Sequence, residues 1–382
     1  MTGKILPALL VLILTVPSAF ALQGKKPTPK PTKPTPRPTA STKPTPRPKP
    51  TPNRPPTTAE AAEAKVSFVD LVFTWPALIF LFVAGVVAFA LGAGIGAAKL
   101  GDNQAKASLR GLEALLLAVI GGLIARMFIA LLLSTAGNSD AAHIAIGWGF
   151  FVVPGIVDTI AKLATHHVVT TADSLVWLGT AVGAFTGFMN GFWKIHEWKG
   201  LGWLAFPLDV TWGLAGATIG SLLHLINFAW AGHADEIRHE AHRYLSGFRL
   251  KSKPTPFAFT QGPVMSSLRD GPGVPLYHHE RTHVWQNRAF GPLFTLSYLG
   301  WMALWVIPAA FAAAIKKDRE AFDAWCYFNN PWETWAYRVG AGPRTGGGRP
   351  KLVWGDLVIL ILSIPYFTGL IALMIWIVLQ VW

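Results

Sequence analysis

The sequence predicts an all-α fold: a polytopic bundle of membrane helices that carries a small domain at the membrane surface. Three features of the composition support this class: 52% of the 382 residues are hydrophobic, only 14% are charged, and the mean hydropathy is +0.39. Such values are typical of chains with several membrane spans and exclude most soluble enzymes. The 17 tryptophans agree, because indole rings favour the membrane interface. The single cysteine, Cys326, excludes an intrachain disulfide framework.

The first 65 residues are expected to lie outside the helix bundle. Residues 1–21 combine Lys4, an apolar core and a small-residue end, which is the pattern of a signal peptide or, alternatively, of an uncleaved signal anchor. Residues 22–65 are rich in proline, lysine and threonine and predict a disordered linker. Most of the net charge of +13 belongs to this linker, so it does not indicate nucleic-acid binding. The linker either contacts an anionic envelope polymer or is a solvated tether without a specific partner.

Residues 66–231 are expected to form a transmembrane bundle of about five helices, each close to the roughly 20 residues that a bilayer crossing requires. The predicted spans are residues 71–98, 109–134, 142–164, 173–193 and 203–231, with a last one at 352–382. Small residues recur at four-residue intervals, as at Gly179, Gly183, Gly187 and Gly191. We expect them to mark faces where helices pack closely.

Four ionisable residues fall within or near the apolar spans: Arg126, Asp158, Asp209 and His224. An ionisable group in such a position normally faces a partner or a water-filled cavity. We therefore expect Arg126 to pair with Asp158 or Asp209. A transport pathway for a small solute is the alternative interpretation.

Residues 279–283 read His-Glu-Arg-Thr-His, the one segment whose residue types and spacing together specify a chemistry. Positions i and i+4 of a helix share a face, so His279 and His283 can direct both imidazoles at one Zn²⁺. Glu280 then lies beside the metal, where a metallopeptidase has the general base for the attacking water. Glu333 is the expected third ligand, and a His₂Glu set leaves a fourth position open. A solvated helix with two surface histidines is the alternative.

The run from His279 to Phe294, HERTHVWQNRAFGPLF, precedes an apolar stretch and an Asn-rich turn into Trp-Glu. This pattern resembles bacterial HExxH membrane proteins of the gluzincin type over about residues 256–340. The resemblance implies a zinc metallopeptidase in which His279, His283 and Glu333 hold the metal and Glu280 is the base. A membrane-protein segment is the expected substrate.

Three further residues are candidates for contact with the substrate or its oxyanion. Gln286 lies one turn further along the face of the two histidines. Tyr277 and Tyr337 lie close to the metal ligands in sequence, although packing in the core is the alternative role for each.

Residues 232–351 are expected to form the metallopeptidase-like domain, on the cytoplasmic side of a bacterial inner membrane if the linker lies outside. The many Lys and Arg residues of this domain agree with the positive-inside tendency. Because Glu333 has to lie on the same side as the two histidines, the apolar residues 290–315 are expected to form a re-entrant hairpin that turns near Trp305 to Pro308. Residues 233–243 are interpreted as a charged helix, and loops or short strands are expected before the metal helix.

Three functions remain open at this point. The first is a membrane-embedded zinc metallopeptidase that hydrolyses peptide bonds at the cytoplasmic membrane surface. The second is a non-catalytic zinc-binding scaffold that its cationic tail tethers to the envelope. The third is a small-solute transporter that uses Arg126 and the intramembrane aspartates.

Overall fold

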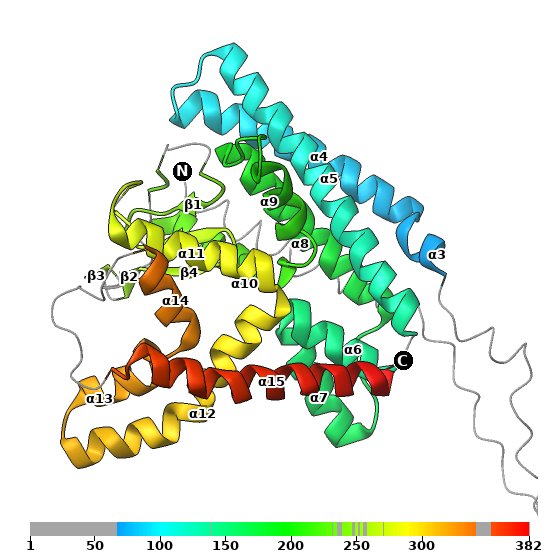
Figure 1. The fold of residues 1–382 in the computed structure, drawn as a ribbon. Helices are drawn as coiled ribbons and strands as arrows, with labels where there is room; N and C mark the ends of the chain where they lie inside the picture. Colours follow the sequence, from blue (N-terminus) through cyan, green and yellow to red (C-terminus); the bar gives the residue numbers. More distant parts are fainter. Residues whose placement is uncertain are drawn as a thin grey trace, which may run out of the picture. The chain divides into compact units, whose positions relative to one another are not determined.

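The structure of the chain is a computed structural model. It describes residues 67–137, 139–230, 232–234, 239–246, 249–250, 253–254, 258–269, 271–340 and 353–381. The predicted signal peptide and linker lie outside these residues. The described residues are mostly helical, as the sequence predicts (Figure 1).

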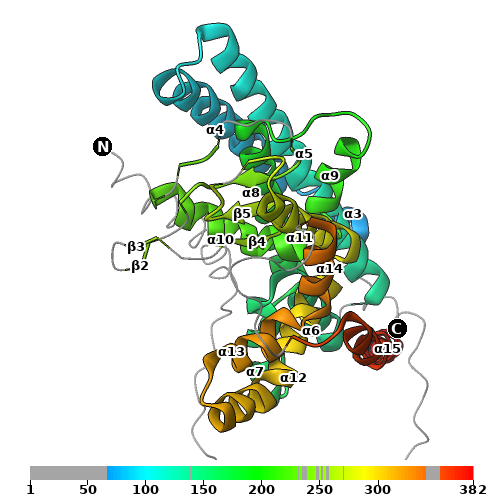
Figure 2. The ribbon, with the colours of Figure 1, turned by 60° about the vertical axis from the view of Figure 1, so that its left-hand side comes forward.

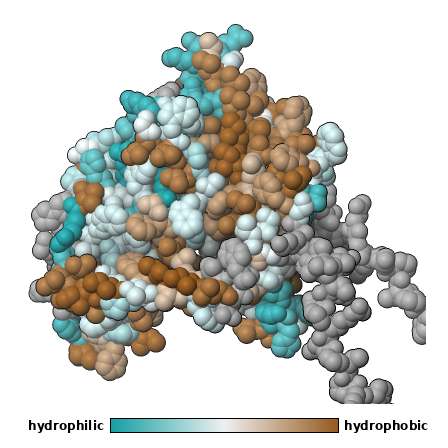
Figure 3. Space-filling model, turned by 45° about the vertical axis from the view of Figure 1, so that its right-hand side comes forward, coloured by the Kyte–Doolittle hydropathy of each residue, from teal (hydrophilic) through white to brown (hydrophobic). Residues whose placement is uncertain are grey.

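Five apolar helical segments of the described residues are long enough to cross a membrane. They are α3 and α4 together (Phe68–Val72 and Trp75–Lys99), α5 (Gln104–Ala136), α8 (Ala172–Trp193), α12 (Pro292–Lys316) and α15 (Asp356–Val381). Hydrophobic side chains gather on the outer faces of α4, α5 and α15 (Figure 3); Phe82, Leu116 and Ile361 are exposed examples. Large exposed apolar side chains of this kind suit contact with lipid and support the predicted membrane character.

Helices α5 and α8 pack closely at their glycines. A Cβ atom built at Gly191 of α8 would lie 2.5 Å from the carbonyl oxygen of Glu113, and one at Gly121 of α5 would lie 2.5 Å from that of Gly183. Gly187 faces the carbonyl oxygen of Leu117 even more closely. Only a residue without a side chain allows such backbone contact, so the glycine ladder is part of the scaffold.

Two of the five predicted crossings in the first half of the chain are not single helices. Residues 142–164 divide into α6 (Asp140–Ile146), the π-helical turn η1 (Gly147–Phe151) and α7 (Val153–Thr165). Residues 203–231 divide into α9 (Gly202–Asp209) and α10 (Leu214–Trp230). Val152 at φ 63° ends the first run, and a Cβ at Gly147 would lie 2.6 Å from the backbone nitrogen of Gly155. Hydropathy does not register such breaks in a helix, which is why the prediction of two single crossings was wrong.

The predicted pairing of Arg126 with an aspartate is also wrong. Arg126 donates hydrogen bonds to the carbonyl oxygen of Val72 at 2.9 Å and to the hydroxyl of Thr180 at 3.3 Å. Asp158 accepts hydrogen bonds from the N–H groups of Val169 and Thr170, both at 2.9 Å. Each side chain is therefore satisfied by hydrogen bonds to uncharged groups rather than by the other.

The other two polar residues of the predicted spans contact the segments that follow them. Asp209 at the end of α9 forms an ion pair with Arg288 at 2.8 Å. His224 of α10 lies with Nδ1 2.8 Å from the hydroxyl oxygen of Tyr244. Both contacts join these helices to the polar segment that follows them, residues 232–289, here called the polar domain.

The polar domain contains short strands, as expected before the metal helix. Strands β1 (His242–Arg243), β5 (Val264–Ser266) and β4 (Phe259–Gln261) form a sheet in that order, with β1 parallel and β4 antiparallel to β5. A separate pair joins β2 (Arg249–Leu250) and β3 (Lys253–Pro254). The prediction of a charged helix over 233–243 is wrong for its described residues, because His233 bridges to Tyr244 and β1 follows.

Helix α12 is continuous from Pro292 to Lys316, so the predicted turn near Trp305 to Pro308 is wrong. Pro308 removes one backbone hydrogen bond, and the helix bends in its course but does not reverse (Figure 1). The reversal comes later, at Lys317, whose φ of 52° is left-handed. A helical hairpin is therefore present, with its turn at the charged end of the apolar run.

The returning limb of this hairpin consists of α13 (Arg319–Asp323) and the π-helical η2 (Ala324–Phe328). The rings of Trp325 and Trp305 lie 5.6 Å apart, and the Asn330 amide donates to the carbonyl oxygen of Tyr298 at 3.3 Å. The chain thus runs back along α12 and begins α14 (Pro331–Gly340) beside α11 (Pro275–Phe290), as both ribbon views show (Figures 1 and 2).

Candidate metal centre

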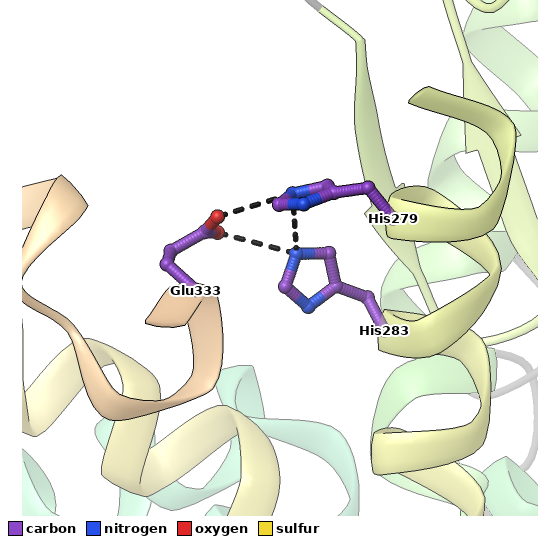
Figure 4. A group of neighbouring side chains, drawn as sticks. All are labelled: His279, His283 and Glu333. Atoms are coloured by element: carbon purple, nitrogen blue, oxygen red, sulfur yellow. Dashed lines mark hydrogen bonds and ion pairs between the residues drawn. The ribbon is translucent and has the colours of Figure 1, made fainter. Parts of the chain in front are cut away.

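Helices α11 and α14 position the three predicted metal ligands. Pro275 occupies the first turn of α11, where its missing N–H is not needed, and Gly291 with φ 51° ends the helix. The histidines at positions 279 and 283 lie one turn apart on the face toward α14. Glu333 lies in the first turn of α14 and points at them (Figure 4).

The three side chains meet in the interior. Glu333 Oε2 lies 3.2 Å from His279 Nε2, and Glu333 Oε1 lies 3.3 Å from His283 Nε2. The two Nε2 atoms are 3.2 Å apart. His279, His283 and Glu333 are 2%, 5% and 2% exposed. The structure therefore gathers residues from two helices into one group that could hold a metal ion.

The spacing of these atoms fits a four-coordinate cation. Ligand arms of 2.0–2.1 Å at tetrahedral angles place neighbouring ligand atoms about 3.3–3.4 Å apart. Glu333 Oε2 is buried and receives no well-aligned hydrogen bond, although His279 Nε2 lies 3.2 Å from it. Two Nε2 atoms this close cannot both direct a proton at the other, and a shared cation would satisfy both lone pairs and the carboxylate at once.

The charges of the group also suit a cation. Burial alone would lower the pKa of His283, but the charge of Glu333 and its hydrogen bond raise it to about 9. Burial would raise the pKa of Glu333, but the two histidines hold it well below its ordinary value. The carboxylate is therefore ionised, and a proton occupies His283 when no metal does.

Gln286 contacts one of the predicted ligands and also lines the groove beside the site. Its Nε2 donates to the carbonyl oxygen of Trp332 at 3.1 Å, which turns Oε1 toward His283 Nδ1 at 2.8 Å. His283 Nδ1 must then carry the hydrogen, so Nε2 presents its lone pair to the metal position. The sequence located Gln286 on the metal face but not this function.

Glu280 lies beside the ligands on the next face of α11. The Thr260 hydroxyl of β4 donates to its Oε2 at 2.6 Å. Burial raises the pKa of Glu280, and the charges of His283 and His279 and the bond from Thr260 only partly oppose this rise. A carboxylate with a raised pKa is suited to take and return a proton near neutral pH.

Three tyrosines differ in their relation to the site. Tyr337 places its ring 4.3 Å from the ring of His279, so it remains a candidate for substrate contact. Tyr277 packs in a core cluster with Met265 and Val284 and therefore has a structural position. Tyr298 was missed by sequence reasoning: its hydroxyl donates to Glu333 Oε1 at 2.7 Å. No spacing rule could find it, because the contact depends on the return of the chain along α12.

A groove of about 890 Å³ borders the site without reaching the ligand atoms. Its walls are the start of α9, the face of α11 that carries His278 and Trp285, and the outer side of α14 at Trp335. None of the three ligands lines it, and Gln286 is the lining residue that contacts one of them. The space between the three ligands is thus enclosed, and the side chain of Gln286 lies between it and the groove.

Comparisons of the chain with protein-family models, curated proteins and solved structures give no match.

Proposed function

We propose that the chain is a membrane-embedded zinc metallopeptidase. The spacing of 3.2 to 3.3 Å among His279 Nε2, His283 Nε2 and the Glu333 oxygens carries this proposal, because two imidazoles and a carboxylate beside a buried glutamate form a typical donor set of catalytic zinc. A bound Zn²⁺ would supply a Lewis acid that lowers the pKa of water and polarises a carbonyl group.

The proton transfer and the positioning of the ligands are assigned to side chains of the protein. Glu280 takes the proton of the attacking water and returns it to the leaving amine, with Thr260 holding the carboxylate in place. Tyr298 holds Glu333 through its hydroxyl, and Gln286 fixes the tautomer of His283. Tyr337, whose ring lies against His279, is the nearest candidate to donate to the carbonyl oxygen.

The proposed location is the cytoplasmic surface of a bacterial inner membrane. Three apolar segments that are long enough to cross a membrane precede the metal helix: α3 with α4, α5, and α8. Three crossings place α11 on the same side of the membrane as five crossings would. The cytoplasmic orientation that the Lys and Arg residues favour is therefore the same for either number. The hairpin of α12 then returns Glu333 to that side. A membrane-protein segment is the substrate that this location favours.

The test is substitution of the proposed base. Glu280→Gln keeps the shape and removes the proton acceptor, so the variant should bind zinc as wild type does and lose about 10²–10⁴-fold in hydrolysis of apolar peptides presented in lipid nanodiscs. Glu197→Gln, an acid in the groove wall, is the matched control and should retain activity. Cleavage by Glu280→Gln at the wild-type rate would contradict the assignment.

A structural zinc site is the second candidate function. The enclosure of all three ligands favours it, since at most 5% of any of them is exposed and the groove stops at Gln286. In that case the wild-type protein holds one zinc ion and cleaves no membrane peptide. Loss of the metal would then lower thermal stability without any loss of turnover.

A further inference from the structure

A second buried polar cluster lies outside the metal centre, at the end of α8. It is a linear chain of side chains, here called the histidine chain, made of Glu240, His196, Asn190, His242 and His233. Its Asn190, His196 and His242 are 0% exposed. None of its members is a proposed metal ligand.

Each member contacts the next at hydrogen-bond distance. Glu240 Oε2 lies 2.6 Å from His196 Nδ1, and His196 Nε2 lies 3.0 Å from the Asn190 amide nitrogen. Asn190 Oδ1 lies 2.8 Å from His242 Nε2, and His242 Nδ1 lies 3.1 Å from His233 Nε2. His233 Nδ1 ends the chain 2.7 Å from the carbonyl oxygen of Ala234.

The number of hydrogens in this chain can be counted. Its five contacts each need one hydrogen, and both ends, a carboxylate and a carbonyl, are acceptors. A neutral imidazole supplies one hydrogen, so the three histidines supply three, and the Asn190 amide supplies one to either of its two neighbours. Neutral groups therefore fill four contacts out of five. The fifth needs one additional proton, because an unfilled contact would set two buried acceptors against each other.

The Asn190 amide decides where this proton lies. With Oδ1 toward His242, as in the structure, the additional proton belongs to His242 or His233. With the amide turned by half a turn, it belongs to the pair of His196 and Glu240. Burial raises the pKa of Glu240, but the hydrogen bonds from His196 and from the N–H of Glu197 lower it overall, so the carboxylate stays ionised and the proton lies on His196. Burial lowers the pKa of His242 well below its ordinary value and that of His233 to about 3, so the end at Glu240 is favoured.

The charged groups around the histidine chain keep Glu240 ionised at one end, where it stabilises a charged His196, and oppose a proton on His233 at the other end. Arg288 donates to the backbone oxygen of Glu240 at 2.5 Å and is itself neutralised by Asp209, while the N–H of Glu197 donates to Glu240 Oε1 at 2.9 Å. At the other end, the charge of Arg243 opposes protonation of His233. His224 adds a further buried imidazole against His242, at a ring distance of 4.3 Å.

We propose that the histidine chain is a proton-binding site that holds one shared proton and presents it to the groove. Glu240 lines the groove together with His278 and Trp285, so this end of the chain is the one from which a bound molecule can receive the proton. The ligand of the site is a proton, and rotation of the Asn190 amide moves it between the two ends. This site is independent of the metal centre and of its proposed activity.

Two substitutions remove the need for the additional proton by different routes. Asn190→Leu divides the histidine chain into two pieces that have three contacts in total, one at His196 and two at His242 and His233. Three neutral histidines supply the three hydrogens that these contacts need. Glu240→Gln is close to isosteric and donates the fifth hydrogen itself, so it keeps the fold if the leucine does not. Controls are Asn227→Leu, a buried asparagine bonded to Ser266 outside the chain, and Glu197→Gln in the groove wall.

The measurement is ¹⁵N NMR of the histidine-labelled full chain in lipid nanodiscs at about pH 8, where ordinary histidines are neutral. The two ring nitrogens of a charged imidazole have similar shifts, whereas those of a neutral ring differ. Wild type and both controls should show one charged ring more than Asn190→Leu and Glu240→Gln. An equal number of charged rings in wild type and in either of these two variants would overturn the proposal.

Discussion

Arg288 donates hydrogen bonds to both carboxylate oxygens of Asp209, at 2.9 and 2.8 Å, and neither side chain has any exposed surface. This pair joins the metal helix α11 to the end of α9. It fixes the helix that carries the two histidine ligands against the membrane bundle. A buried pair of this kind is far more costly to break than to replace.

Arg288→Met should therefore lower the free energy of unfolding by about 3–5 kcal/mol, because Asp209 is left buried and unpaired. The double variant Asp209→Leu with Arg288→Met should recover most of this loss, since no uncompensated charge remains. Denaturant unfolding followed by circular dichroism in detergent measures both. A double variant as unstable as the sum of the two single ones would show that the charges are not coupled.

Gln286→Leu should weaken metal binding by about 10–100-fold, because the hydrogen bond that fixes the tautomer of His283 is lost while all three ligands remain. Competition with a chelator of known affinity measures the change. Thr282→Ala on the groove side of the same helix is the control and should bind metal as wild type does. If Gln286→Leu matches that control, the amide does not orient the ligand.

Metal binding should strengthen with rising pH up to about 9, because the raised pKa of His283 means that a proton must leave before the metal enters. The raised pKa of His283 also contributes to the stability of the metal-free protein, because the folded state binds the proton more tightly than the unfolded state. This contribution is complete below the unfolded pKa of 6.5 and is lost as pH rises through about 9. Thermal unfolding of the chelated protein between pH 6 and 9.5 tests this direction, and His283→Ala should remove the slope. A slope that His283→Ala retains would assign the titration to another group.

Gly187→Ala should destabilise the bundle by about 1–3 kcal/mol, because its methyl group would overlap the carbonyl of Leu117 on α5. Gly94→Ala on α4 is the matched control, since nothing lies within 4 Å of the Cβ position there. Thermal unfolding in the same detergent compares the two. Equal stability of both variants would mean that α5 and α8 do not pack at this glycine.

The sequence alone predicted that His279 and His283 lie one turn apart on one face of a helix, because an i, i+4 pair constrains geometry within a single helix. The meeting of Glu333 with that pair followed from chemistry rather than from hydropathy. The prediction of the path between them was wrong: Pro308 favours a turn by its sequence, whereas the helix continues through it and the chain turns at Lys317.

Contacts between distant segments were beyond the reach of spacing rules. Arg126 is satisfied by a backbone carbonyl and a threonine hydroxyl, which no charge pattern reveals. The histidine chain draws His196, Glu240 and His242 from irregular segments and a strand, so no helical period connects them. Tyr298 contacts Glu333 only because the returning limb of the hairpin runs along α12.

Elemental analysis of the purified protein tests the central claim most directly. Wild type should contain one mole of zinc per mole of chain, and both His283→Ala and Glu333→Ala should lose it. Glu280→Gln is the control and should keep the metal, since Glu280 lies beside the ligands and not among them. Full zinc content in Glu333→Ala, or none in wild type purified without chelator, would contradict the account.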